Sequence, residues 1–165
     1  MHIAKLMEEG KVDFSGIPSS YFLLGLLTAF DNRFQASADR TMGEISWKQF
    51  FAVICTDLCR EPPTLKELSE IMGCSHQNAK QILLKLQKKG FVVLKTDEQD
   101  KRKQRIHLTD TCRRFCQANE QISGKIMEAM FRGISETDLQ TAIRTILAIE
   151  DNLKEMDGNE NLSRL

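Results

Sequence analysis

The chain has 165 residues, 23 basic and 23 acidic side chains, and a formal net charge of zero at pH 7. This length suits one domain, over residues 1–165, with a hydrophobic core of its own. There is no apolar run of transmembrane length and no charged-then-apolar leader, so we expect a soluble, cytoplasmic protein without membrane contact. Five cysteines in such a chain indicate reduced thiols and argue against a disulfide framework.

The first part of the chain predicts an arm and two helices. Residues 1–15 have no strong periodicity, and we expect an arm or a loose tail there. Apolar residues on one broad face predict a helix over about 20–39. After a short loop, Ser46-x-x-Gln49 caps a second helix, which runs to about Arg60 and is stopped by a pair of prolines.

The next stretch has the pattern of a helix-turn-helix. Thr64-Leu65-Lys66-Glu67 is a capping box that opens a short amphipathic helix, and this helix stops at Gly73, a residue suited to a left-handed exit. Ser75 opens a second helix, which closes at Gly90. In this motif the second helix enters the major groove of DNA. Its apolar residues fall at i, i+3, i+4 and i+7: Ala79, Ile82, Leu83 and Leu86.

Two β-prone runs follow, over residues 91–94 and 105–108, with the charged loop 97–103 between them. A hairpin with a charged tip directly after such a helix is a winged helix. The segment from His76 to His107 has nine basic and three acidic side chains, so its net charge is +6. The rest of the chain therefore has a net charge of −6. Although any exposed helix and hairpin is charged, this excess falls on the surface that a winged helix presents to phosphate.

The last part of the chain predicts a helix over about 110–132, a break at Gly133, a helix over about 135–156 and a polar tail. Apolar stripes on these helices could close the domain's own core. The stronger hypothesis is a two-fold dimer built from the first and last helices. A repressor with one such motif needs two copies, because paired half-sites one helical turn apart supply the specificity that one helix cannot.

A set of residues in the middle of the chain matches a known pattern: Gln49, Leu65-x-x-Leu68, Gly73-x-Ser75, Leu86 through Gly90, Asp100-Lys101-Arg102 and Leu108-Thr109. By these residues the chain resembles a family of bacterial transcription factors, the MarR (multiple antibiotic resistance regulator) family. The resemblance covers nearly the whole chain in layout, but by motif only residues 45–109. The fold it implies is mainly α with a small β-hairpin: a winged helix-turn-helix DNA-binding lobe over 45–109, with dimerisation helices over 18–40 and 110–156, in an obligate homodimer.

We expect the DNA contacts on the outward face of the second helix and on the wing. Asn and Gln amides can pair with adenine, and Lys favours guanine or phosphate. Lys85 and Lys88 lie further along the helix, where we expect phosphate contacts. The resemblance implies that Arg102 reaches into the minor groove and that Asp100 holds its rotamer. The predicted DNA-binding residues are Ser75, His76, Gln77, Asn78, Lys80, Gln81, Lys85, Lys88, Asp100, Lys101, Arg102 and Lys103.

Three residues depart from the family pattern. The family often has arginine where Gln81 and Gln99 stand, so this chain is expected to read different bases or to bind more weakly. Leu84 is apolar off the core face, where a polar residue is usual. A contact with the wing or with a neighbouring helix is one explanation for it.

The sequence thus favours a homodimeric, sequence-specific transcriptional regulator, a repressor rather than an activator, on a pseudo-palindromic operator in double-stranded DNA. The resemblance implies release by a small apolar or phenolic ligand, with Tyr21, Phe22, Trp47 and Phe50 as candidate pocket walls, although core packing uses the same residue types. No cofactor or metal site is expected. There is no Gly-rich phosphate loop, His-Glu-x-x-His motif or nucleophile elbow, so we do not expect an enzyme.

Two alternatives stay open. A winged helix can serve as a protein-interaction module without a DNA role, and the net charge of zero supports that. A thiol- or metal-responsive regulator is suggested by the helical i, i+4 pairs Cys55/Cys59 and Cys112/Cys116 and by Cys74 in the turn. Structural zinc sites prefer the tighter Cys-x-x-Cys spacing, and buried cysteines more often fill a core.

Overall fold

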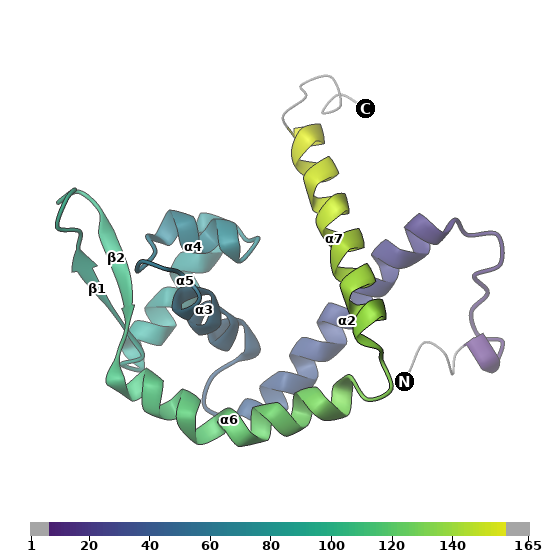
Figure 1. The fold of residues 1–165 in the computed structure, drawn as a ribbon, viewed down its shortest axis with the longest axis horizontal. Coiled ribbons are helices and arrows are strands. Elements are labelled where there is room, and N and C mark those ends of the chain that lie inside the picture. The colour runs from purple at the N-terminus through teal and green to yellow at the C-terminus, as the bar shows by residue number, and fades with distance from the viewer. Residues whose placement is uncertain (1–6, 158–165) are drawn as a thin grey trace. The chain divides into compact units, whose positions relative to one another are not determined.

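The computed structural model describes residues 7–157 (Figure 1). The start of the predicted arm (1–6) and the predicted tail (158–165) lie outside the described residues. The described chain divides after Phe115 into two compact units. The expected fold class, mainly helical with a small β-hairpin, is confirmed. In chain order the elements are α2 (Ser19–Met42), α3 (Trp47–Asp57), α4 (Leu65–Ile71), α5 (His76–Lys88), β1 (Val92–Thr96), β2 (Gln104–Leu108), α6 (Asp110–Met130) and α7 (Glu136–Asp157).

The two predicted capping boxes start α3 and α4. The Ser46 hydroxyl accepts the backbone N–H of Gln49 at 3.3 Å, and the Gln49 side chain accepts the Ser46 N–H at 3.2 Å. In the same way the Thr64 hydroxyl accepts the backbone N–H of Glu67 at 3.3 Å, and the backbone N–H of Thr64 donates to the Glu67 carboxylate at 2.7 Å. The bonds from Thr64 hold the pKa of Glu67 below its ordinary value of 4.5. These side chains satisfy amides that the first turn of a helix leaves unpaired.

The helix ends differ from the sequence prediction at two places. The first predicted helix continues to Met42, through part of the expected loop, and ends where Gly43 takes the left-handed φ of 62°. The helix α3 ends at Asp57, short of Arg60, and the chain then extends toward its two prolines. A residue before proline is disfavoured in helical backbone geometry, so the helix stops ahead of the pair.

The core of the first unit lies under α5 and the hairpin. The predicted apolar face of α5, which consists of Ala79, Ile82, Leu83 and Leu86, is buried. The largest fully buried side chains are Phe91, Leu68, Leu86, Ile106 and Cys112, drawn from α4, α5, β2, the turn before β1 and the start of α6. Burial of such side chains supplies about 1.5–3 kcal/mol each, which holds the short helices together.

The strands form an antiparallel hairpin, with Val92 opposite Leu108 and Thr96 opposite Gln104 (Figure 1). The strand β2 is also tied to the segment ahead of α4, because the Ile106 N–H donates to the carbonyl of Pro63 at 2.8 Å. Phe91, predicted as a strand residue, instead precedes β1 and is buried.

One residue closes the hairpin at its base. The Thr109 hydroxyl donates to the carbonyl of Gly90 at 2.6 Å, and the Thr109 N–H donates to the carbonyl of Phe91 at 3.0 Å. The same hydroxyl accepts the N–H of Cys112 at 3.2 Å, so Thr109 caps α6 as the sequence predicts. The end of α5, both ends of the hairpin and the start of α6 therefore meet at one side chain.

The second unit holds the rest of α6 and α7. The chain turns at Gly133, whose φ is 80°, and the Ser135 hydroxyl accepts the Asp138 N–H at 3.1 Å to start α7. No residue of α7 is buried. The exposed large apolar side chains of this unit include Ile122, Met127, Met130, Phe131, Ile134, Ile143, Ile146, Leu147, Leu153 and Met156. No helix over residues 7–157 is long and apolar enough to cross a membrane.

A matched pair of leucines tests this description of the core. Leu68 is 1% exposed and Leu58, at the end of α3, is 79% exposed. We expect Leu68→Ala to lower the free energy of unfolding by about 2–5 kcal/mol, because it leaves a cavity under α5. Leu58→Ala should stay within about 0.5 kcal/mol of the parent. Urea unfolding followed by circular dichroism measures both, and equal losses would contradict the assignment of the core.

Candidate nucleic-acid interface

The helix α5 presents a polar face opposite its buried one. The Ser75 hydroxyl caps the helix by accepting the Asn78 N–H at 3.2 Å, which leaves other amides of the first turn pointing outward. Every predicted DNA-binding residue on this helix is exposed: Ser75, His76, Gln77, Asn78, Lys80, Gln81, Lys85 and Lys88. The structure therefore brings these eight side chains together on one accessible element, with basic residues toward its C-terminal end.

The wing tip holds the second group of predicted residues. The Asp100 carboxylate accepts the backbone N–H of Arg102 at 3.1 Å and its Nε–H at 3.2 Å. These two bonds hold the pKa of Asp100 below its ordinary value of 3.8. Lys103 approaches the same carboxylate at 3.7 Å. The side chain of Arg102 is 92% exposed, so Asp100 directs this guanidinium without covering it.

The base of the wing is fixed by a network that the sequence reading missed. The Asp97 carboxylate is buried and accepts the N–H groups of Gln99 and Asp100, each at 2.8 Å, as well as the Nε–H of Arg105. These bonds, that of Arg105 first, lower the pKa of Asp97 to about 2. The pairing with Asp97 also raises the pKa of Arg105.

Arg105 also reaches beyond the hairpin. One of its terminal nitrogens donates to the carbonyl of Pro62 at 2.9 Å and lies 3.9 Å from the Glu67 carboxylate. The guanidinium therefore joins the hairpin to the segment ahead of α4 and to the capping box of that helix. The sequence signal for this network is limited to an arginine in the second β-prone run, Arg105, and an aspartate at the start of the loop before it, Asp97. Their charges alone do not predict that they pair.

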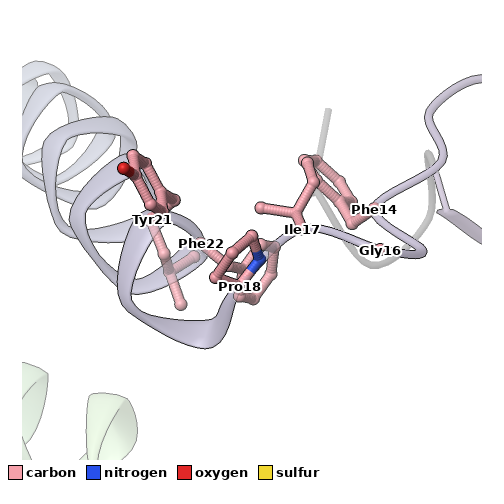
Figure 2. Close-up of a pocket in the computed structure, with 8 residues that line it drawn as sticks. Phe14, Gly16, Ile17, Pro18, Tyr21 and Phe22 are labelled. Carbon is pink, nitrogen blue, oxygen red and sulfur yellow. The ribbon is translucent and has the colours of Figure 1, made fainter.

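The four predicted ligand-site residues do not gather in one place. Tyr21 and Phe22, on the first turn of α2, line a pocket of about 560 Å³ with the segment before that helix, including Phe14 and Ile17 (Figure 2). Phe14 and Phe22 meet edge to face, with ring centroids 5.0 Å apart. Trp47 lines a different pocket.

This second pocket, which we call the turn pocket, also has a volume of about 560 Å³. Trp47 meets Phe34 edge to face at 4.6 Å between centroids, and these rings form its apolar wall. Phe50 contacts Trp47 on one side and Phe115 on the other, with centroids 6.1 and 6.5 Å apart. The lining residues are Asp31, Phe34, Gln35, Trp47, Lys48, Phe51, Met72, Gly73, Cys74, Asn78 and Ile82.

Comparison with known proteins identifies the fold. No family model matches the sequence. A crystal structure of a MarR/EmrR family transcriptional regulator from Acinetobacter sp. ADP1 superposes with a TM-score of 0.74, covering 84% of this chain and 99% of that one at 11% identity. This chain has the MarR fold. MepR of S. aureus, in a crystal structure of its complex with DNA, gives a TM-score of 0.67 over 78% of this chain and 94% of its own at 14% identity. BpsR of Bordetella bronchiseptica, whose DNA binding is regulated by 6-hydroxynicotinic acid, gives 0.66 over 85% and 97% at 14% identity.

Within this MarR fold the cysteines do not form a metal centre. No group of three or more His, Cys, Asp or Glu side chains in residues 7–157 could hold a metal ion. Cys55 and Cys112 are buried in the core, as the more common role of such residues predicts. Burial raises the pKa of the Cys55 thiol, and the neighbouring Cys59 and Cys74 raise it further. A raised pKa lowers the fraction of thiolate, which is the reactive form.

The wing network gives a pH dependence with a defined sign. The pKa of Asp97 lies at about 2 in the folded chain, below its ordinary 3.8. The stability contributed by its ionised form is therefore complete above pH 4 to 5 and is lost as the pH falls from about 4 toward 2. We expect Asp97→Asn to lower the urea midpoint at pH 6 and to make its decline between pH 4 and 2 shallower.

Asp57→Asn is the matched control, because it removes one exposed carboxylate from the same unit. Urea midpoints of the parent and both variants, measured from pH 2 to 6, provide the comparison. If Asp97→Asn kept the acid decline of the parent, the assignment of this network would be wrong.

Proposed function

We propose that this chain is a sequence-specific DNA-binding transcriptional regulator that acts in the cytoplasm as a homodimer and represses its targets. The observation that carries the proposal is the exposed polar face of α5 beside a basic wing. Nothing in the hydrophobic core requires so many amide and lysine side chains on one face. The same fold occurs in MepR, whose crystal structure has been determined in complex with DNA.

In this proposal the N-terminal half of α5 reads bases in the major groove. Gln77, Asn78 and Gln81 carry amides that can pair with both the N6 and the N7 of adenine, and Lys80 favours guanine or phosphate. Lys85 and Lys88 contact phosphate, which fixes the position of the helix without reading sequence. The capped N-terminus of α5 adds its partial positive charge to the phosphate side.

The wing supplies the second contact. The guanidinium of Arg102 enters the adjacent minor groove, oriented by the bond from its Nε–H to Asp100, while the backbone N–H of Arg102 donates to the same carboxylate. Lys101 and Lys103 flank it and meet the phosphates on either side. A narrow minor groove concentrates negative potential and attracts such an arginine, so the wing favours sites with A·T-rich flanks.

Exposed apolar side chains support the homodimer. The helix α2 has no buried residue, and Tyr21, Leu24 and Phe30 on it are exposed. Over residues 116–157 the second unit exposes ten large apolar side chains, on α6, α7 and their connection. Large exposed apolar patches are rare on soluble monomers and mark interaction sites. We propose that residues 18–40 and 110–156 form the dimer interface and that residues 45–109 form the DNA-binding lobe.

The turn pocket is our candidate for the binding site of a ligand that causes release of DNA. It combines the rings of Phe34, Trp47 and Phe51 with polar groups at its rim, a composition that suits a small apolar or phenolic molecule. Asn78 and Ile82 line it from α5 itself. A ligand that favours a displaced α5 must weaken DNA binding by the same coupling free energy that DNA imposes on the ligand. The regulation of BpsR by 6-hydroxynicotinic acid is a precedent in this fold.

Selection of bound sequences from a random duplex pool, at two salt concentrations, tests the proposed function. We expect a palindromic consensus with half-sites about ten base pairs apart and an affinity that falls steeply with salt. Dependence on salt follows from the release of counterions by the wing and by α5. No enrichment, or binding that salt does not change, would overturn the DNA role and favour a protein-interaction module instead.

The wing is tested separately by Arg102→Ala. We expect weaker binding to the selected site by roughly 1–3 kcal/mol, with the dimer intact in sedimentation equilibrium. Arg102→Lys should recover only part of the loss, because an ammonium lacks the flat, multiply donating guanidinium. Arg60→Ala, which removes the same charge from an exposed position after α3, outside the predicted DNA contacts and the proposed dimer helices, is the control. Parent-like affinity for Arg102→Ala would show that the wing tip does not contact DNA.

A further inference from the structure

Leu84 is an apolar side chain in the middle of the polar face of α5. It is 48% exposed, whereas the four core residues of that helix are buried. It follows Gln81 by three positions and precedes Lys88 by four, and side chains at these spacings lie on the same face of a helix. Gln77, seven positions earlier, begins the same stripe. Leu84 therefore points in the same direction as the side chains that we propose read DNA.

The fold itself does not require leucine at this position. Leu84 adds little to the core, and glutamine or lysine would serve the helix about as well, because their helix propensities are similar. The contact with the wing or with a neighbouring helix that the sequence suggested would bury the side chain, which is instead half exposed. A single exposed leucine is ordinary on a protein surface. This one, however, lies on the stripe between two glutamines and a lysine.

The chemistry of the major groove offers such a side chain one partner. Bases present hydrogen-bond donors and acceptors there, and the C5-methyl of thymine is the apolar group among them. We propose that Leu84 contacts a thymine methyl in each half-site and thereby specifies thymine at that position; this inference rests on the proposed DNA-binding function. With Gln77 and Gln81 favouring adenine, the outward stripe of α5 selects A·T pairs.

Deoxyuridine gives a direct test, because it lacks only the methyl group of thymine. Each thymine of the selected site is replaced in turn, in both half-sites, and Kd is measured for the parent chain. We expect one symmetry-related thymine whose replacement weakens binding about fourfold per half-site, the effect of one buried methyl or methylene group. Leu84→Ala should bind the thymine site more weakly by a similar factor and should be indifferent to that replacement.

Two further variants make the result specific. Leu58→Ala, which truncates an exposed leucine just after α3 in the same unit, should behave as the parent on both duplexes. Leu84→Met, which keeps an apolar side chain of similar reach, should retain the loss on deoxyuridine. All of these variants should keep the salt dependence of the parent, since none changes a charge.

The outcomes separate this inference from the proposed function. If the parent selects a palindrome and binds it with steep salt dependence, but no thymine methyl matters, the role of Leu84 is overturned and the DNA role stands. The role is equally overturned if Leu84→Ala keeps the full loss on deoxyuridine. If the parent binds no duplex at all, both proposals fail.

Discussion

The geometry of the winged unit depends on one guanidinium. Arg105 lies near the start of β2, yet its partners come from three other places: Asp97 after β1, the carbonyl of Pro62, and the carboxylate of Glu67, which completes the cap of α4. Asp97 in turn holds the first amides of the wing loop. A two-stranded hairpin is marginal by itself in water, so it needs such links to keep a defined position. Through Arg105 the wing and the helix-turn-helix share one ion-pair network.

The parts of this structure that follow local rules could be predicted from the sequence. The capping hydroxyls of Ser46, Thr64 and Ser75 mark helix starts because they satisfy amides within three residues of themselves. The buried stripe of α5 follows from the 3.6-residue period. The length of α2 was underestimated, because the left-handed exit at Gly43 lies beyond residues that resemble a loop.

Features that depend on distant contacts could not be predicted in the same way. The spacing of Asp97 and Arg105 in the sequence does not predict that they pair. The pair depends on the burial of Asp97 and on the distant carbonyl of Pro62, which also binds Arg105. The pocket of Tyr21 and Phe22 likewise depends on how the segment before α2 folds back on that helix. The turn pocket of Trp47 depends on how α2, α3 and the turn before α5 come together. The predicted DNA-binding residues of α5 are exposed where the pattern places them, but their contact with DNA stays a prediction. The sequence marks Leu84 as an apolar residue off the core face of α5. Its exposure in the structure is what places it on the outward stripe of that helix.

Thr109 has a mechanical consequence for this unit. Its backbone and hydroxyl bind the carbonyls of Gly90 and Phe91, and its hydroxyl also accepts the first paired amide of α6. The end of α5 and the beginning of α6 therefore cannot rotate relative to each other at the base of the hairpin without breaking several bonds at once. We expect α5, the wing and the first turn of α6 to move as one rigid body. In the proposed dimer, the distance between the two copies of this body would be adjusted elsewhere, farther along α6 or at the Gly43 loop.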